Sequence, residues 1–205
     1  MPKRTGILFV TVGAVLLISA LLLFLYNDVE SRRAGRQSEL LLAEIQAEIK
    51  AETVPQTEPA ESTEPAETLP AEMPVKVIGK YEYIGYLSIA AIELELPVMA
   101  QWDYDRLKTA PCRQFGSART DDLVIAAHNY RSHFGKLSGL EPGTEILFTD
   151  MEGIENHYML TRQAILPPDA VDAVRNSGHD LVLYTCTPGG ASRVTVRCSA
   201  VNNNG

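Results

Sequence analysis

A cysteine and an arginine stand on either side of a tight turn near the end of the chain. The run LVLYTC, which ends at Cys186, is typical of a strand, a turn rich in proline and glycine follows, and Arg193 opens the alternating run RVTVR. If these strands pair antiparallel, the Cys186 sulfur lies near the Arg193 guanidinium at one rim of a sheet. A guanidinium stays charged at any working pH and favours a nearby thiolate, the reactive form of cysteine.

A cysteine that transfers acyl groups also needs an acid or base within hydrogen-bond reach. Among the four histidines, His128 is the strongest candidate, because it directly follows the apolar run LVIAA and opens a polar loop. His133, five residues later in that loop, is its nearest competitor. His157 falls inside a predicted hairpin strand and His179 in a turn, and an ordinary surface histidine is the more common finding at such positions.

A competing interpretation is that a cysteine at a strand end is a small core residue, which is the more frequent case. Cys198 illustrates it, because Cys198 shares strand parity with two valines and is predicted to face the core. Arg193 and Arg197 share the opposite parity. Arg193 is the preferred candidate for the arginine that acts with Cys186, because it is nearer the turn. Arg197 is the second candidate. Cys112 follows a proline at the end of a predicted helical or turn segment, with no partner in view.

Composition excludes several function classes. The net charge of -8 is concentrated in residues 51–75, which hold six glutamates and no lysine or arginine, so the remainder is near neutral. No clustered basic surface suggests nucleic-acid binding. The three cysteines lack C-x-x-C spacing and no acidic cluster suggests calcium, so neither a metal nor a cofactor is expected.

The N-terminal region predicts a membrane anchor. Residues 6–26 carry no charge and are long enough for one bilayer crossing, and residues 1–36 are assigned to a short cytoplasmic stub, this span and juxtamembrane residues. A cleaved signal peptide is the rival interpretation, but the apolar run is long and no clear cleavage site follows it. Lys3 and Arg4 favour a cytoplasmic N-terminus, although Arg32, Arg33 and Arg36 nearly balance the positive charge. The expected topology is single-pass, with the body of the protein outside the cell.

Two segments connect this span to the globular part. Residues 37–50, QSELLLAEIQAEIK, have leucine and isoleucine at helical spacing and predict a juxtamembrane helix. Residues 51–75 are rich in proline, glutamate and threonine and hold five of the twelve prolines. Such a segment cannot bury enough apolar surface to fold, so it is expected to be an extended, disordered tether.

Residues 76–205 are predicted to form one domain. The pattern indicates at least two strand segments in 83–99, a buried strand at 123–127, a hairpin of 144–148 with 155–166, a short helix within 168–175, and the final pair of strands. Many short strands with only short helices predict a mostly-β fold, as a closed or nearly closed sheet.

Four stretches resemble the sortase family, the membrane-anchored cysteine transpeptidases of Gram-positive surfaces. They are residues 83–99, the run LVIAAHNYRSHFGKL at 123–137, LVLYTC at 181–186, and Ser192-Arg193. The order histidine, cysteine, arginine is also that of the family, and the resemblance covers roughly residues 83–201. It implies a closed eight-stranded sortase-type β-barrel with short helices and the triad His128, Cys186 and Arg193. Expected substrate contacts nearby are Thr185, Thr187, Arg197 and Asn129. The subclass stays open between class B-like and class D-like.

The resemblance implies a reaction as well. Cys186 would attack a carbonyl in the C-terminal sorting motif of a secreted protein and form a thioacyl enzyme. An amine from a peptidoglycan precursor or a pilin lysine would then resolve it, and Arg193 and His128 would assist. The enzyme would be hydrolase-like in class, located at the cell membrane. Two alternatives stay open: an extracellular cysteine peptidase that uses water as acceptor, and a non-catalytic binding domain on a stalk.

Overall fold

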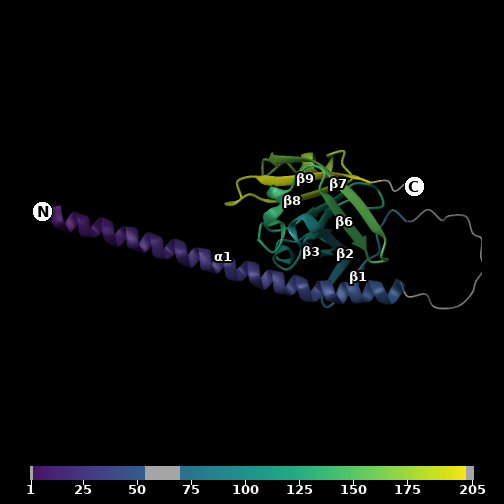
Figure 1. The fold of residues 1–205 in the computed structure, drawn as a ribbon, viewed down its shortest axis with the longest axis horizontal. Helices are drawn as coiled ribbons and strands as arrows, with labels where there is room; N and C mark the ends of the chain where they lie inside the picture. Colours follow the sequence, from purple (N-terminus) through teal and green to yellow (C-terminus); the bar gives the residue numbers. More distant parts are fainter. Residues whose placement is uncertain (1, 54–69, 202–205) are drawn as a thin grey trace, which may run out of the picture.

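The computed structural model describes residues 2–53 and 70–201. Most of the predicted tether, residues 54–69, and the last four residues lie outside the described residues. The described chain forms one long helix and a β-rich body with a few short helical turns (Figure 1). The strands are β1 (Lys76–Ile78), β2 (Tyr81–Ile89), β3 (Leu94–Met99), β4 (Cys112–Phe115), β5 (Leu123–Ala126), β6 (Glu145–Asp150), β7 (Glu155–Leu166), β8 (Leu181–Cys186) and β9 (Arg193–Ala200). The helices are α1 (Pro2–Thr53), α2 (Val171–Arg175) and the 3-10 turns η1 (Ala90–Ile92), η2 (Arg106–Lys108) and η3 (Phe134–Gly139).

The sheet closes on itself. Its order within the described residues is β1-β2-β3-β4-β5-β8-β9-β7-β6, and β6 also pairs with β2. Eight strands therefore form a closed mixed barrel, while β1 extends one end of β2 as a small hairpin. The β3–β4 and β5–β8 pairs are parallel and the rest are antiparallel. The mostly-β, eight-stranded barrel predicted from the sequence is confirmed.

Two strands were not anticipated from the sequence. β1 is only three residues long, and β4, with the sequence CRQF, lies where the sequence suggested the end of a helical segment. In β4 only Cys112 is fully buried. A strand this short, with two polar residues in its middle, lacks the alternation that would identify it.

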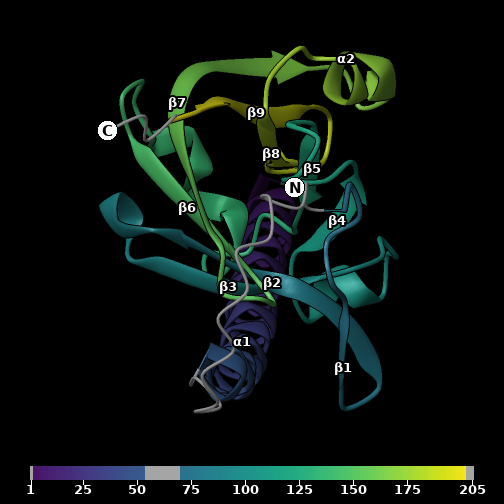
Figure 2. The ribbon, with the colours of Figure 1, turned by 90° about the vertical axis from the view of Figure 1, so that its right-hand side faces the viewer.

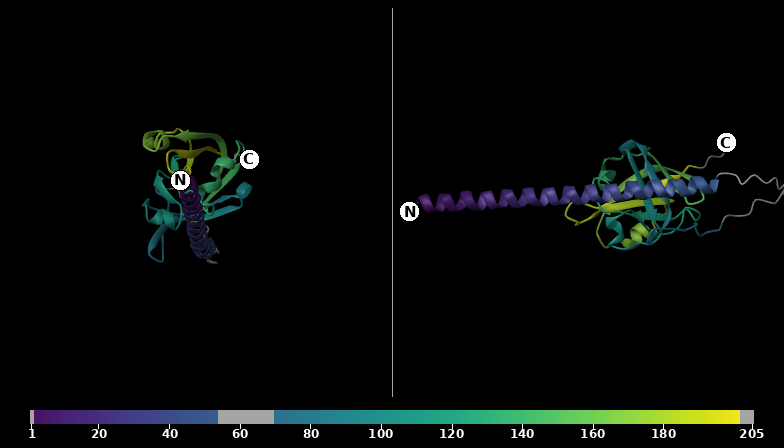
Figure 3. Two further views of the ribbon diagram at one scale, coloured as in Figure 1. Left: turned by 90° about the vertical axis from the view of Figure 1, so that its left-hand side faces the viewer. Right: turned by 90° about the horizontal axis from the view of Figure 1, so that it is seen from below.

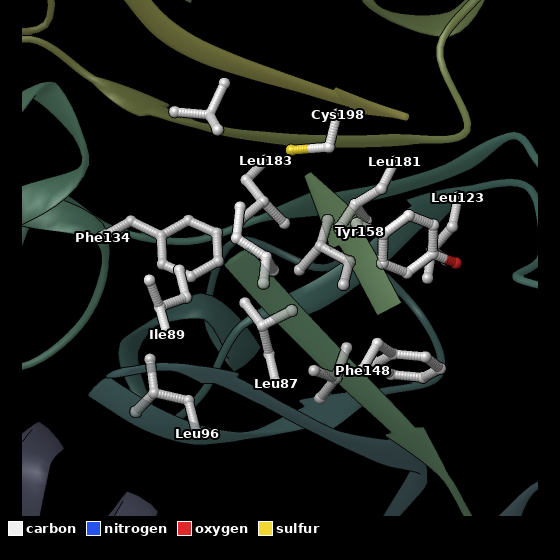
Figure 4. Close-up of a cluster of buried hydrophobic side chains, with 14 of the residues drawn as sticks. Leu87, Ile89, Leu96, Leu123, Phe134, Phe148, Tyr158, Leu181, Leu183 and Cys198 are labelled. Atoms are coloured by element: carbon white, nitrogen blue, oxygen red, sulfur yellow. The ribbon is translucent and has the colours of Figure 1, made fainter. Parts of the chain in front are cut away.

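The barrel interior is filled by the alternate side chains of its strands. Figure 4 shows Leu87 of β2, Phe148 of β6, Tyr158 of β7 and Leu183 of β8 converging there, and Cys198 of β9 turned into the same cluster. Cys198 is fully buried, as its strand parity predicted. The interior is a packed core with no room for substrate, so any site must lie on the outer face or at a rim.

Helix α1 runs without interruption from Pro2 to Thr53 and has two different halves. The large apolar side chains between Ile7 and Tyr26 are exposed, and this part is long and apolar enough to cross a membrane. The second half lies against the barrel, where Ile45 and Ile49 pack into a cluster with β-strand residues such as Tyr83 and Met99. The 37–50 segment is thus helical and belongs to the same helix as the apolar span.

The arrangement gives the barrel a defined direction relative to α1. In two perpendicular views the β8–β9 turn projects toward the N-terminal, apolar half of the helix (Figures 1 and 3). Seen end-on, α1 passes along the side of the barrel that carries β1, β2 and β3 (Figure 2). The β6–β7 turn lies at the opposite end, because β7 begins beside the end of β9 and finishes beside Arg193.

Candidate active site

Strand pairing brings the three predicted catalytic residues into one row. Cys186, the last residue of β8, lies directly opposite Arg193, the first residue of β9. Side chains at directly opposed positions have Cβ atoms about 5 Å apart. On the other side of β8, the parallel ladder ends at the pair Ala126–Tyr184, and His128 and Cys186 each lie two residues beyond that pair. The three side chains therefore start from neighbouring positions at the end of the barrel that points toward the apolar half of α1.

Two hydrogen bonds hold the ends of β5 and β8 together. The amide of Ala127 donates to the carbonyl of Tyr184 at 3.2 Å, and the Thr185 hydroxyl donates to the carbonyl of Ala127 at 2.8 Å. Thr185 is buried, so its side chain points into the barrel while Cys186 on the next position points out. Thr185 thus fixes the spacing between the histidine strand and the cysteine strand.

Arg193 is held by the turn that precedes it. Its Nη1 atom donates to the carbonyls of Gly190 and Ser192 at 3.0 and 3.1 Å. Thr187 closes the same turn, because its amide donates to the Ser192 carbonyl and its hydroxyl accepts from the Ser192 amide. A guanidinium carries five N–H donors, so within the described contacts Arg193 keeps Nη2 and Nε for a ligand.

His128 sits between two aromatic rings. The centroid of the Tyr130 ring lies 4.9 Å from that of the His128 ring, with an interplanar angle of 32°. The Tyr104 ring packs edge-on, with its centroid 6.2 Å from that of the His128 ring. The His128 Nε2 atom is buried and has no hydrogen-bond partner among the described residues. Burial lowers the pKa of His128, the nearby Lys108 lowers it further, and Glu30 of α1 acts in the opposite direction.

The other two cysteines are poor nucleophiles. Cys112 and Cys198 are fully buried, and burial raises the pKa of each thiol to about 12. Both therefore stay protonated at neutral pH. Cys186 is half-exposed and stands opposite a permanent cation, so it is the cysteine placed for chemistry.

A cleft of about 230 Å³ opens beside Arg193 on the outer face of the barrel. Its floor includes Tyr184, two residues before Cys186 on the same face of β8, and its wall includes Val171 and Val174 of α2. A larger cleft of about 630 Å³ runs along β4 and shares Trp102 with it, but none of the three candidate catalytic residues lines this larger cleft. The smaller cleft is therefore the better candidate for a substrate groove.

The structure separates the two arginines that the sequence left open. Arg197 lies opposite Val182, four residues before Cys186 on β8, and donates from Nη2 to the Ala173 carbonyl of α2 at 3.2 Å. It braces α2 and does not meet Cys186. Asn129 is exposed beside His128.

The histidines also differ in their surroundings. His133 is fully buried, with its Nε2 atom 3.3 Å from the Ser38 hydroxyl of α1. The His157 Nδ1 atom lies 3.0 Å from a carboxylate oxygen of Glu145 near the surface, and His179 is far along the chain in the turn before β8. Neither lies in the row with Cys186.

Sequence reasoning missed the aromatic and charged neighbours of His128. Tyr130 could have been found from its spacing, because residues two apart after a strand fall on one side of an extended chain. Tyr104, Lys108 and Glu30 come from distant segments, and no local pattern connects them to His128.

Comparison with known proteins gives one consistent result. A family model described as Sortase domain matches residues 87–201. Sortase A of Bacillus anthracis is 28% identical over 122 residues, which cover 57% of this chain and 58% of that protein. The chain thus spans less than two thirds of that curated relative.

Solved structures share the fold. Sortase C1 from Streptococcus agalactiae superposes with a TM-score of 0.52 at 26% identity, covering 62% of this chain and 72% of that one. Sortase A from Corynebacterium diphtheriae superposes with a TM-score of 0.54 at 21% identity, covering 62% and 65%.

Proposed function

Because the chain belongs to the sortase family, we propose that it is a cysteine transpeptidase with Cys186 as nucleophile, His128 as acid and base, and Arg193 as oxyanion donor. The observation that carries this proposal is the clustering at one barrel end, where Cys186 is paired with Arg193, and where Cys186 and His128 each lie two residues beyond the last parallel pair of β8 and β5. The three residue types supply a nucleophile, a proton carrier and a fixed positive charge.

In the proposed reaction the Cys186 thiolate attacks a peptide carbonyl. A tetrahedral intermediate forms, and its oxyanion accepts hydrogen bonds from the free donors of Arg193. His128 in its protonated form gives its proton to the leaving amine, the C–N bond breaks, and a thioacyl enzyme remains. An incoming amine then attacks the thioester, His128 takes up the proton, and Cys186 leaves as thiolate.

The substrate is proposed to be the C-terminal sorting signal of a secreted protein, of the Leu-Pro-x-Thr-Gly or Asn-Pro kind. The cleft beside Arg193 supports a peptide substrate, because its lining combines Arg193 and Tyr184 with the apolar side chains of Val171 and Val174 in α2. The acceptor is proposed to be an amine of a peptidoglycan precursor or a pilin lysine.

The apolar half of α1 is proposed to anchor the enzyme in the cell membrane with the barrel outside. Lys3 and Arg4 precede the span, which favours a cytoplasmic N-terminus. Membrane-held substrates and wall precursors would then lie on the same side as the barrel.

The test is a ligation assay on the full chain in detergent micelles. Fluorogenic peptides with Leu-Pro-x-Thr-Gly and Asn-Pro-x-Thr-Gly motifs are offered with and without triglycine, and products are identified by mass spectrometry. We expect a ligated peptide only when triglycine is present, and none from Cys186→Ala. Cleavage that triglycine never converts to ligation indicates a peptidase that uses water. Turnover retained by Cys186→Ala contradicts the nucleophile assignment.

A further inference from the structure

The membrane helix contacts the loop that carries His128. Ser132, four residues after His128, donates from its hydroxyl to the Ser31 carbonyl at 2.7 Å, and its amide donates to the Ser31 hydroxyl at 3.4 Å. A Cβ atom at Gly35 would stand 3.0 Å from the Ser132 Cβ atom. The helix backbone and the loop are therefore in direct contact, and glycine at position 35 permits the close approach.

Further contacts extend this interface in both directions along α1. The Tyr130 hydroxyl reaches the Glu30 carboxylate at 3.5 Å. Further along α1, after Gly35, the Ser38 hydroxyl donates to the Thr109 carbonyl at 2.8 Å. The same hydroxyl oxygen lies 3.3 Å from the His133 Nε2 atom. Because the Ser38 proton goes to Thr109, its oxygen accepts from His133. Positions 30, 31, 35 and 38 lie on one face of a helix, and that face covers residues 130–133.

Tyr130 connects this interface to His128. The centroid of its ring lies 4.9 Å from that of the His128 ring and 5.5 Å from that of the His133 ring. Tyr130 is half-buried and contacts Glu30, and His133 is fully buried and contacts Ser38, so both rings belong to the interface with α1. The His128 ring, by contrast, has no hydrogen bond at Nε2 from the described residues to fix it. Aromatic packing is therefore what orients it.

We propose that α1 is a working part of the active site, and that its 30–38 face positions the His128 imidazole through Tyr130. Tyr130 is a positioning residue that acts through His128. This inference rests on the proposed function, because it assigns His128 the proton-transfer role. According to this proposal, a displacement of α1 would also displace the loop that carries His128.

The charges that face His128 fit this arrangement. Glu30 of α1 favours the imidazolium, while Lys108 of η2 disfavours it. The rings of Tyr104 and Tyr130 pack against the His128 ring, and burial lowers the pKa of His133, which contacts Tyr130. Cys186 and Arg193 lie at the neighbouring strand ends. Moving α1 away would remove the one carboxylate that acts on His128 among its described neighbours.

The first test is a wedge in the helix–loop interface of the full chain. Gly35→Met places a side chain against Ser132, and Ala43→Met, on the exposed face of the same helix, is the matched control. With the better of the two fluorogenic peptides and triglycine, Gly35→Met is expected to lower kcat about tenfold to a hundredfold with KM changed less than twofold, because misplaced catalytic groups cost rate. Ala43→Met is expected to match the wild type.

The second test addresses Tyr130 directly. Tyr130→Leu removes the ring and is expected to lower kcat to a similar extent, while Tyr130→Phe keeps the ring and is expected to restore most of it. Glu30→Gln is expected to shift the limb of the pH–kcat profile that reports His128 to lower pH, because the carboxylate that favours the imidazolium is lost. Glu39→Gln, on the exposed face, leaves the profile unchanged.

Alkylation of Cys186 by iodoacetamide separates positioning from general damage. The proposal requires that Gly35→Met and Tyr130→Leu keep a wild-type alkylation rate while transfer falls. It is overturned if Gly35→Met transfers as fast as Ala43→Met, or if alkylation and transfer fall in parallel. Absence of ligation by the wild-type chain would be a failure of the proposed function itself, so the two failures are distinct.

Discussion

At the residue scale, the two arginines of β9 show how one register position decides a role. Arg193 and Arg197 have the same parity and differ only in their partners across the strands. Arg193 faces Cys186 and is held by two carbonyls of the turn, whereas Arg197 faces Val182 and braces α2. Parity alone could not choose between them, because the choice depends on where β8 ends.

Lysine substitutions test this difference. We expect Arg193→Lys to lower kcat/KM about a hundredfold or more, because one ammonium cannot hold the turn and donate to an oxyanion at the same time. Arg197→Lys is the matched control and is expected to cost less than threefold in kcat/KM, with a small loss of stability. Ligation kinetics with the fluorogenic peptide measure both. Equal losses, or a larger loss in Arg197→Lys, would reverse the assignment.

At the element scale, the loop between β5 and η3 depends on α1 for its conformation. His133 in that loop is buried against the helix, and burial lowers its pKa to about 4, with a smaller contribution from His128. The folded state therefore prefers the neutral imidazole more than the unfolded chain does, where the pKa is near 6.5. Folding stability from this site is complete above about pH 6.5 and is lost as the pH falls toward 4.

This pH dependence can be measured by thermal unfolding. The wild-type transition is expected to move down as the pH is lowered from 7 to 4.5, and the site contributes on the order of 3 kcal/mol over its full range. His133→Phe cannot take up a proton and is expected to show a flatter dependence. A slope in His133→Phe equal to that of the wild type would contradict the burial argument.

The sequence predicted the elements whose patterns are local. The alternation in RVTVRC identified β9 and turned Cys198 inward, and the apolar run before His128 identified β5. β4 was not predicted, because its four residues of mixed polarity show no periodicity. The residues around His128 were not predicted either. Glu30 is about a hundred residues away in sequence, and only the packing of α1 against the barrel brings it near the His128 loop.

At the scale of the whole molecule, α1, as the proposed membrane anchor, would set the position of the barrel mouth relative to a membrane. Glu30 follows Tyr26, the last residue of the apolar span, by four residues, or about 6 Å along the helix axis. If the apolar span crosses a membrane as proposed, the contact between Glu30 and the loop that carries His128 would hold this end of the barrel close to the bilayer surface. Residues 51–75 were predicted to be an extended tether, and most of that segment lies outside the described residues. Because α1 packs against the barrel, the distance between the barrel and the bilayer surface would depend on α1.

Quenching by lipid-borne nitroxides tests this placement. In a Cys186→Ala background reconstituted in vesicles, a fluorophore at Ala191→Cys in the β8–β9 turn is expected to be quenched several-fold more by headgroup-level spin labels than one at Glu155→Cys. Glu155 begins β7 at the opposite end of the barrel. Equal quenching at both positions would mean that the helix does not hold the barrel in this orientation.

The central claim concerns a single sulfur atom, and intact-protein mass spectrometry tests it most directly. The full chain is mixed with an excess of the donor peptide, quenched in acid, weighed, and digested to locate any adduct. We predict a mass increase equal to the acyl portion of the peptide, located on Cys186 and discharged by triglycine with formation of the ligated product. Cleavage without an adduct on Cys186, or an adduct on Cys112 or Cys198, would contradict the account.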